Sequence, residues 1–415
     1  MKHWVRFCCV VHGLALAIAW SAFSSLANAQ DPTSKAPFLL ADFPGLEKEC
    51  MSVLENKDQL ETVLARIESK YEAGQQPEAI RMLSAILRGS DMGQGDGWFG
   101  PAKQRYDWNW IATKHKVESD QSLSKQDFQG DAFFFERLDR NGDGELKNDD
   151  LDWTTSSPFM REQGIANGIF RRIDKGQDGR VSKEELLAFF DNARGNSSEL
   201  GIDAFRRSLG LGNSAGGYYP GDAPTPERLM QGFFANELGS LQEGPNLGEI
   251  APDFELTTQD GTRTIRLKDW VGTKPLVLIF GNFTCGPFRR TYPDFDEIGQ
   301  RYKDQAHFFG VYVREAHPDD GWVMESNTKL GVKLKQPTNF DERKAVAVTC
   351  ASQLKYSMPL LVDTMDDRVG NLYSGMPARA YVIDVDGKVT YQGGRGPFGF
   401  RPGEMEQALI MTLMK

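Results

Sequence analysis

The chain has 415 residues, and its 58 acidic side chains outnumber its 48 basic ones, which gives a formal net charge of −10. This length predicts two or three domains, and a hydrophobic content of 40% with 11% aromatic residues excludes a wholly disordered chain. The acidic balance argues against a nucleic-acid partner, because phosphates attract Lys and Arg.

The first 29 residues have the pattern of an export signal. A basic head precedes a mostly apolar stretch, residues 7–20, and Ala27 and Ala29 supply the small residues of a cleavage site. We therefore expect a mature chain that starts at Gln30 and is periplasmic or secreted. The alternative is an uncleaved membrane anchor, but the apolar run is shorter than the ~20 residues that span a bilayer. No later stretch is apolar and long enough, so no stable membrane span is expected after cleavage.

Residues 30–128 are expected to form a helical N-terminal region with a structural role. Apolar residues between Leu60 and Tyr71 recur at helical spacing, and a second stripe runs from Ile80 to Leu87. Pro77 suits the start of this second helix and Gly89 suits its end.

Two stretches resemble the twelve-residue calcium loop of EF-hand proteins. The first begins at Asp139 and the second at Asp174, and the resemblance covers about residues 130–192, so we expect an EF-hand pair over residues 129–209. The alternative is two acidic turns that bind nothing. A degenerate third loop at 116–127 lacks the glycine and is not counted as a site. The predicted Ca²⁺ ligands, some through their carbonyls, are Asp139, Asn141, Asp143, Glu145, Asp150, Asp174, Asp178, Arg180 and Glu185.

Glycine and proline are dense in residues 210–246, which predicts a linker. From residue 247 to 415, strand-like and helical runs alternate. Residues 276–280 and 307–313 predict strands, and Asp386-Gly387 predicts a hairpin between two later strands. A closing amphipathic helix follows. The expected architecture is therefore multidomain, with an all-α N-terminal part that includes the EF-hands and a C-terminal α/β thioredoxin-like domain.

Cys285 is the leading candidate for a catalytic residue. It follows the predicted strand 276–280 and opens a helix, where unsatisfied N–H groups favour thiolate over thiol. Phe288 stands where a Cys-x-x-Cys motif would have its second cysteine, so no disulfide forms within the motif. Signal cleavage would leave Cys50 and Cys350 as the other cysteines, and an odd number leaves at least one thiol unpaired.

Four stretches of the C-terminal part resemble the iodothyronine deiodinases. They are residues 276–288, 311–322, 377–383 and 391–397, and the most specific is the Glu-Ala-His-x-x-Asp-Gly-Trp segment that begins at Glu315. The resemblance implies an oxidoreductase that removes halogen from a small aromatic substrate and is restored by an external thiol. Cys285 occupies the place of the selenocysteine in that family.

The resemblance also implies roles for five further residues. Glu315 and His317 match the proton-handling network, and Thr284 lies in the turn that holds the nucleophile. Arg379 matches an arginine that binds the amino-acid end of the substrate, and Pro377 matches a proline, usually cis, that faces the sulfur. An imidazole near neutral pH is suited to donate the proton that the dehalogenated carbon needs.

Several alternatives stay open. Cys350 or Cys50 could act as a resolving thiol. The same fold could support a thiol peroxidase in which Cys285 passes through a sulfenic acid. The chain could also be a non-catalytic calcium-binding scaffold. For His317, Glu315 and Arg379, ordinary surface positions are the structural alternative.

Overall fold

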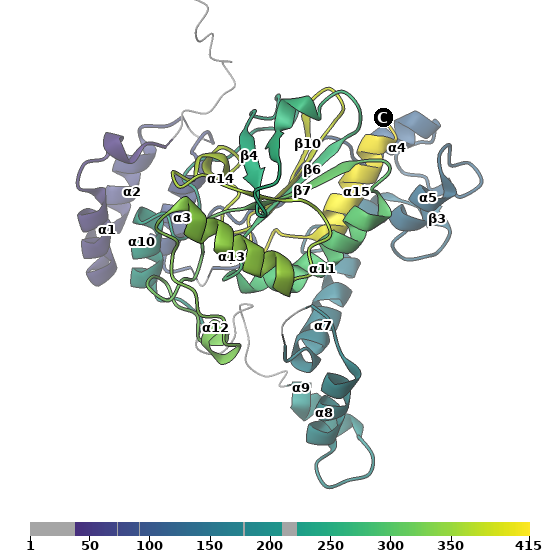
Figure 1. Cartoon of the computed structure of the whole chain (residues 1–415), viewed down its shortest axis with the longest axis horizontal. Coiled ribbons are helices and arrows are strands. Elements are labelled where there is room, and N and C mark those ends of the chain that lie inside the picture. The colour runs from purple at the N-terminus through teal and green to yellow at the C-terminus, as the bar shows by residue number, and fades with distance from the viewer. Residues whose placement is uncertain (1–37, 73, 91, 177–178, 210–221) are drawn as a thin grey trace, which may run out of the picture. The chain divides into compact units, whose positions relative to one another are not determined.

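The computed structural model describes residues 38–72, 74–90, 92–176, 179–209 and 222–415 (Figure 1). The predicted export signal, residues 1–29, lies outside these ranges. Within the described ranges, no helix combines the length and the apolar character that crossing a bilayer requires.

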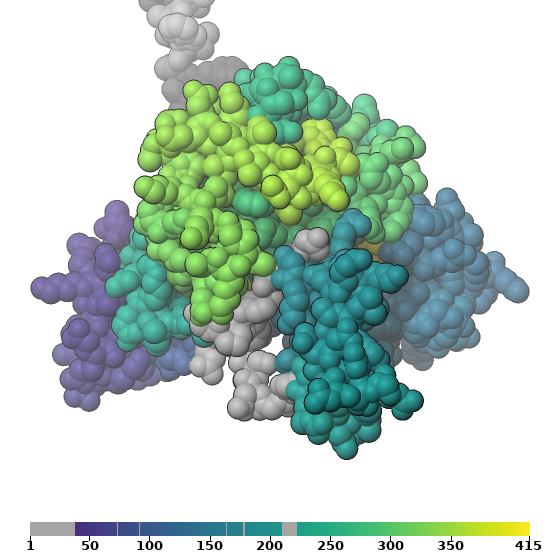
Figure 2. Space-filling view, turned by 60° about the horizontal axis from the view of Figure 1, so that its bottom comes forward, coloured from purple at the N-terminus to yellow at the C-terminus, as the bar shows by residue number. Residues whose placement is uncertain are grey.

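The N-terminal helices share a hydrophobic core with a helix from much later in the sequence. α1 (Leu46–Glu55), α2 (Leu60–Glu68) and α3 (Glu78–Arg88) confirm the expected helical region. Two 3-10 turns, η1 (Leu40–Asp42) and η2 (Lys57–Gln59), precede α1 and α2. α10 (Pro226–Phe234) packs against α1 and α3, and Figure 2 shows it in teal beside the purple helices.

α10 corrects part of the predicted linker, residues 210–246. Residues 210–221 lie outside the described ranges, but the next residues form a capped helix. Pro226 occupies the first turn, and Thr225 Oγ1 accepts a hydrogen bond from the N–H of Arg228 at 3.2 Å. The buried side of α10 consists of Leu229, Met230 and Phe233. Pro226 therefore marks a helix start and not a loop.

The expected pairing of the two calcium-type loops is wrong. β3 (Glu145–Leu146), in the 139–150 loop, pairs with β2 (Leu123–Ser124), which lies in the degenerate 116–127 loop, and Leu123 faces Leu146. In the described part of the chain, β2 is the only strand in this small sheet with β3. The helices of this region are α4 (Trp108–His115), α5 (Ala132–Leu138), α6 (Asn148–Leu151), α7 (Pro158–Ile173), α8 (Lys183–Arg194) and α9 (Ile202–Leu209). Apolar pairing at this position does not require metal ligands, which explains why the degenerate loop is the partner.

The C-terminal part forms the predicted α/β domain. Its sheet has the order β1-β10-β9-β6-β7-β8-β4-β5, in which β6, β7 and β8 are parallel and the other pairs are antiparallel. The strands are β4 (Glu255–Thr258), β5 (Thr264–Arg266), β6 (Leu276–Gly281), β7 (His307–Tyr312), β8 (Leu360–Val362), β9 (Arg379–Ile383) and β10 (Val389–Gln392). β1 (Lys103–Gln104) comes from the N-terminal region and extends the edge at β10, so the expectation of an all-α N-terminal part is wrong at this strand.

Helices cover this sheet in the order that the sequence predicts. They are α11 (Gly286–Arg301), α12 (Glu325–Lys329), α13 (Phe340–Gln353), α14 (Arg368–Leu372) and α15 (Pro402–Leu413), and the 3-10 turn η3 (Leu267–Asp269) follows β5. Every residue of β6 is buried, which is why its sequence is one continuous apolar run. The predicted hairpin joins β9 to β10, and Gly387 in its turn has a φ of 79°. The thioredoxin-like architecture places the end of β6 next to the end of β7.

Candidate active site

Cys285 lies where the sequence predicts, between β6 and α11. It is the N-cap residue of α11, and its backbone N–H donates to Asn282 Oδ1 at 3.0 Å. A side chain at Gly281 would meet the ring of Phe288 at 2.1 Å, so glycine lets the turn pack closely on the helix. The Cys285 side chain is only 2% exposed, but it lines a cavity of about 570 Å³.

The expected activation of the Cys285 thiol by the helix N-terminus alone is wrong for the free protein. Burial raises the pKa of Cys285 to about 11, although the backbone N–H of Phe288 and the cations Arg289 and Arg290 act in the opposite direction. The loss of solvation outweighs the helix end because the sulfur is enclosed. Near neutral pH, Cys285 is therefore a thiol that needs a base.

His317 lines the same cavity and has the properties of that base. Its Nδ1 lies 3.2 Å from the carbonyl oxygen of Trp322, and its ring packs edge-on against the Trp322 indole with centroids 5.0 Å apart. A carbonyl oxygen accepts hydrogen bonds only, so Nδ1 carries the proton and Nε2 is left with a lone pair. Burial lowers the pKa of His317 to about 4. The predicted proton donor is therefore a neutral imidazole near neutral pH, which must accept a proton before it can donate one.

Glu315 and Thr284 hold the turn that carries Cys285. The N–H and hydroxyl of Thr284 donate to Glu315 Oε2 at 2.8 and 2.7 Å, and the hydroxyl of Tyr312 donates to Glu315 Oε1. The Thr284 hydroxyl also accepts the N–H of His317 at 3.0 Å. Burial raises the pKa of Glu315, although these hydrogen bonds act in the opposite direction. Neither residue lines the cavity, so both act on the positions of Cys285 and His317 and not on a bound molecule.

Pro377 follows a cis peptide bond, as the resemblance implies, and lines the cavity. Its carbonyl accepts a hydrogen bond from Asn282 Nδ2 at 3.1 Å, which ties the proline segment to the turn before Cys285. Two distant segments therefore meet at the sulfur.

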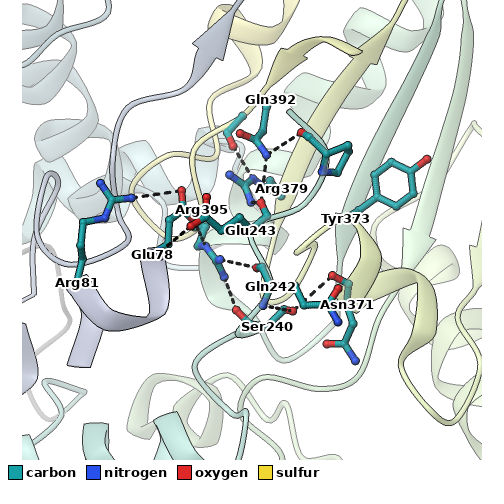
Figure 3. Close-up of polar contacts among 12 residues, drawn as sticks. Glu78, Arg81, Ser240, Gln242, Glu243, Asn371, Tyr373, Arg379, Gln392 and Arg395 are labelled. Carbon is teal, nitrogen blue, oxygen red and sulfur yellow. Dashed lines mark hydrogen bonds and ion pairs between the residues drawn. The ribbon is translucent and has the colours of Figure 1, made fainter. Parts of the chain in front are cut away.

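Arg379 does not lie where the substrate role requires. Its Nε donates to the Gly393 carbonyl at 2.6 Å and its Nη1 to the Glu243 carbonyl at 2.9 Å, and it does not line the cavity (Figure 3). Figure 3 also shows the neighbouring Arg395 bonded to Glu78 from α3. The Nε of Arg395 lies 3.0 Å from Glu78 Oε2. Arg395 joins α3 to the α/β domain, whereas Arg379 is held by two carbonyls, and a substrate-binding role for Arg379 has no support from the geometry.

Neither of the other two described cysteines lines the cavity. Cys350 is completely buried on α13, and Cys50 is completely buried on α1 in the core of the N-terminal helices. Both are free thiols, as is Cys285. Neither lines the cavity, so a resolving role for either is not favoured by this arrangement.

Several residues of the site escape sequence reasoning. Arg289 and Asn327 are buried beside Cys285, but a pair of arginines on a helix suggests a solvated face, and a lone asparagine carries no signal. The cavity is also lined from outside the α/β domain. This outer part of the lining includes Met82, Met92, Phe99, Met160, Phe170 and Leu229. No local pattern brings these distant segments together.

The predicted Ca²⁺ ligands of the first loop are ordered around its glycine turn. Asp139 accepts the N–H groups of Gly142 and Gly144 at 2.8 and 2.9 Å. Asn141 accepts the N–H of Asp143, and Asp143 accepts the N–H of Glu145. Asp150 is buried and accepts the N–H of Lys147 at 3.0 Å. The Glu145 side chain pairs with Lys147 at 2.8 Å, which leaves the predicted Glu145 carbonyl as its ligand group.

In the second loop, Asp174 accepts the N–H of Gly179 at 3.1 Å, and Glu185 accepts that of Gly176 at 2.9 Å. The Arg180 side chain pairs with Glu297 at 3.5 Å, and Asp178 lies outside the described residues. Among the residues that the structure describes, no three His, Cys, Asp or Glu side chains are grouped closely enough to form a ready metal site.

Comparisons with known proteins bear on the C-terminal part. A sequence model described as iodothyronine deiodinase matches residues 230–411. The thyroxine 5-deiodinase of Sparus aurata is 32% identical over 186 residues, which cover 45% of this chain and 67% of that protein. The thyroxine 5-deiodinase of Gallus gallus is 36% identical over 161 residues, which cover 39% of this chain and 60% of that protein. A thiol:disulfide interchange protein of the thioredoxin family from Chlorobium tepidum is 18% identical with a TM-score of 0.29, covering 41% of this chain and 99% of that one.

Proposed function

Because this chain belongs to the iodothyronine deiodinase family of oxidoreductases, we propose that it is a thiol-dependent reductive dehalogenase of a small aromatic halide. The observation that carries the proposal is the presence of the Cys285 thiol and the neutral His317 imidazole on the wall of one cavity. The chain spans 60 to 67% of the length of the two relatives compared above, so the activity and its substrate are proposals for this protein.

In the proposed reaction, the Cys285 sulfur attacks the halogen. The carbon–halogen bond breaks, a sulfur–halogen bond forms, and the carbon keeps the electron pair. His317 Nε2 takes the thiol proton and delivers it to that carbon, so the aromatic product gains the hydrogen that Cys285 loses. The substrate is reduced by two electrons and the sulfur is oxidised to a sulfenyl halide.

An external thiol completes the cycle. It attacks the Cys285 sulfur, releases halide and a proton, and leaves a mixed disulfide. A second thiol attacks that disulfide, restores the Cys285 thiol and departs as an external disulfide, which balances the two electrons. Cys350 and Cys50 are fully buried and do not line the cavity, which favours an external reductant over an internal one.

The test is halide release from an iodinated phenol in the presence of dithiothreitol. Cys285→Ser should abolish release, and Cys350→Ala should retain it because Cys350 does not line the cavity. Release that persists in Cys285→Ser would disprove the assignment. Consumption of hydrogen peroxide by the native protein without any halide release would instead favour the thiol peroxidase.

We also propose that the calcium-type loops bind Ca²⁺. Carboxylate and carbonyl oxygens suit this ion, and Gly144, with a φ of 83°, makes the sharp turn that such a loop needs. Ca²⁺ that binds only the folded state at 100 times its Kd adds about 2.7 kcal/mol of stability. Asp139→Asn and Glu185→Gln should each reduce the calcium-dependent rise in melting temperature. An unchanged midpoint at millimolar Ca²⁺ would exclude both sites.

Export is proposed from the sequence of residues 1–29 alone. The test is the N-terminal residue of the protein recovered outside the cytoplasm, which should be Gln30. Recovery of the intact chain in the cytoplasm would contradict the proposal.

A further inference from the structure

We propose that Arg289 is the counter-ion of the Cys285 thiolate, and so a positioning residue that holds the ionised sulfur during the reaction. The inference rests on the proposed function for its role in catalysis. Its measurement does not, because thiol reactivity is read without any aromatic substrate.

Arg289 is placed beside the sulfur by the first turn of α11. Its backbone N–H donates to the Cys285 carbonyl at 3.1 Å, so the two residues are one helical turn apart and lie on one face. Nη2 of Arg289 lies 3.8 Å from the position that a Cβ atom would take on Gly286. The guanidinium is therefore next to the residue that follows Cys285. Arg289 Nη1 donates to the Phe283 carbonyl, and Nη2 donates to Asn327 Oδ1 at 2.7 Å. These contacts fix the cation around the turn 282–285.

Arg289 is a buried cation without a carboxylate partner among the described residues. It is 5% exposed, and its hydrogen-bond acceptors are a carbonyl and an amide, both neutral. No ion pair involving Arg289 is formed within the described ranges, unlike the buried Arg395, which pairs with Glu78. A buried charge is unfavourable unless an opposite charge compensates it. The Glu315 carboxylate acts on Arg289 without forming an ion pair with it, and ionisation of Cys285 would supply a further negative charge.

The ionisable groups around the site agree with this role. Arg289 acts to lower the pKa of Cys285, and it also acts to lower the pKa of His317. The Arg289 cation stabilises the Cys285 thiolate and destabilises a protonated His317. It therefore favours transfer of the proton from His317 to the substrate carbon. The other charged or titratable groups that act on Cys285, His317 or Arg289 are Arg290, Glu315, Arg228 and Cys350.

The test is the rate at which iodoacetamide alkylates Cys285 in the full chain, followed by mass spectrometry of the Cys285 peptide from pH 7 to 10. An opposite charge at close range lowers a pKa by about one unit or more, so Arg289→Met should slow alkylation at fixed pH by about tenfold or more. Arg289→Lys should stay within about threefold of the native rate. The matched control is Arg290→Met, the same change on the next residue, which is half-buried and should have the smaller effect.

Arg289→Gln provides a second neutral variant that keeps a hydrogen-bond donor, in case Arg289→Met does not fold. Slow alkylation in the neutral variants with recovery in Arg289→Lys supports the counter-ion. Equal slowing in Arg289→Lys and Arg289→Gln, or a larger effect of Arg290→Met, overturns it. If the neutral variants alkylate slowly but the native protein releases halide from no aromatic substrate, the proposed function fails and the counter-ion stands.

Discussion

Replacing His317 by Ala should change the pH dependence of the chemical step and not only its rate. The pKa values of His317 and Cys285 are about 4 and about 11, so their separation is about 7 units. Complete transfer of the proton to the imidazole before reaction is therefore unfavourable. We infer that transfer accompanies carbon–halogen cleavage. The reactive form, a thiol and a neutral imidazole in one cavity, predominates between these two values, so the native contribution to the rate is flat over that range.

Without the imidazole, the reaction depends on thiolate formed by solvent. With a pKa of about 11, the thiolate fraction at pH 7 is about 10⁻⁴ and rises about tenfold per pH unit. The ratio of native to His317→Ala rates should consequently fall about 10³-fold between pH 7 and pH 10. The assay is single-turnover formation of the dehalogenated phenol without reductant, and ionisation of the substrate cancels in the ratio. His307→Ala is the control, since His307 begins β7 and contacts Thr273. A ratio that does not change with pH would refute the proton transfer.

Three further predictions concern stability and positioning. Glu78→Gln should lower the free energy of unfolding, measured in urea at pH 7, by about 3–5 kcal/mol, because Arg395 would remain charged and buried. The control is Arg81→Met, which removes the exposed arginine that also pairs with Glu78. A loss below about 1 kcal/mol in Glu78→Gln would contradict the reasoning. Burial acts to raise the pKa of Glu78, but Arg395 and the other nearby cations lower it overall, so this stabilisation is present above the unfolded pKa of 4.5 and is lost as pH falls through the folded value. The difference in free energy of unfolding between the native protein and Glu78→Gln should therefore shrink below about pH 4.5. A difference that grows there would contradict the reasoning. Thr284→Val removes the hydroxyl that bonds both Glu315 and the N–H of His317. The single-turnover rate should fall about tenfold, while the Tm should change by only a few degrees. An unchanged rate would show that Thr284 does not position the site.

The sequence was sufficient for features that local chemistry determines. The buried run of β6, the Asp386-Gly387 hairpin and the position of Cys285 at a helix start each depend on a few adjacent residues, and the structure confirms all three. The approach of His317 to the same cavity followed from its place after β7, because parallel neighbouring strands end at one edge.

Charge states and distant contacts were beyond sequence reasoning. The helix start at Cys285 suggested a thiolate, but burial, which depends on the whole fold, outweighs it. The substrate role of Arg379 came from the family resemblance, and no local pattern predicts its bonds to the carbonyls of Gly393 and Glu243, which are distant in the sequence. The expected pairing of the 139–150 loop with the loop that begins at Asp174 is also wrong. The apolar contact of Leu123 with Leu146, and not the ligand residues, determines the partner.

The mixed origin of the cavity wall has an evolutionary consequence. The reacting groups Cys285 and His317 belong to the α/β domain, whereas Met82, Met160 and Leu229 reach the same space from helices that precede it. Mutations in those helices can reshape which molecules are admitted while the chemistry is inherited intact. Related enzymes could therefore diverge in substrate specificity while they keep the same reaction. Their sequence differences should accumulate at such cavity-lining positions before they affect Cys285.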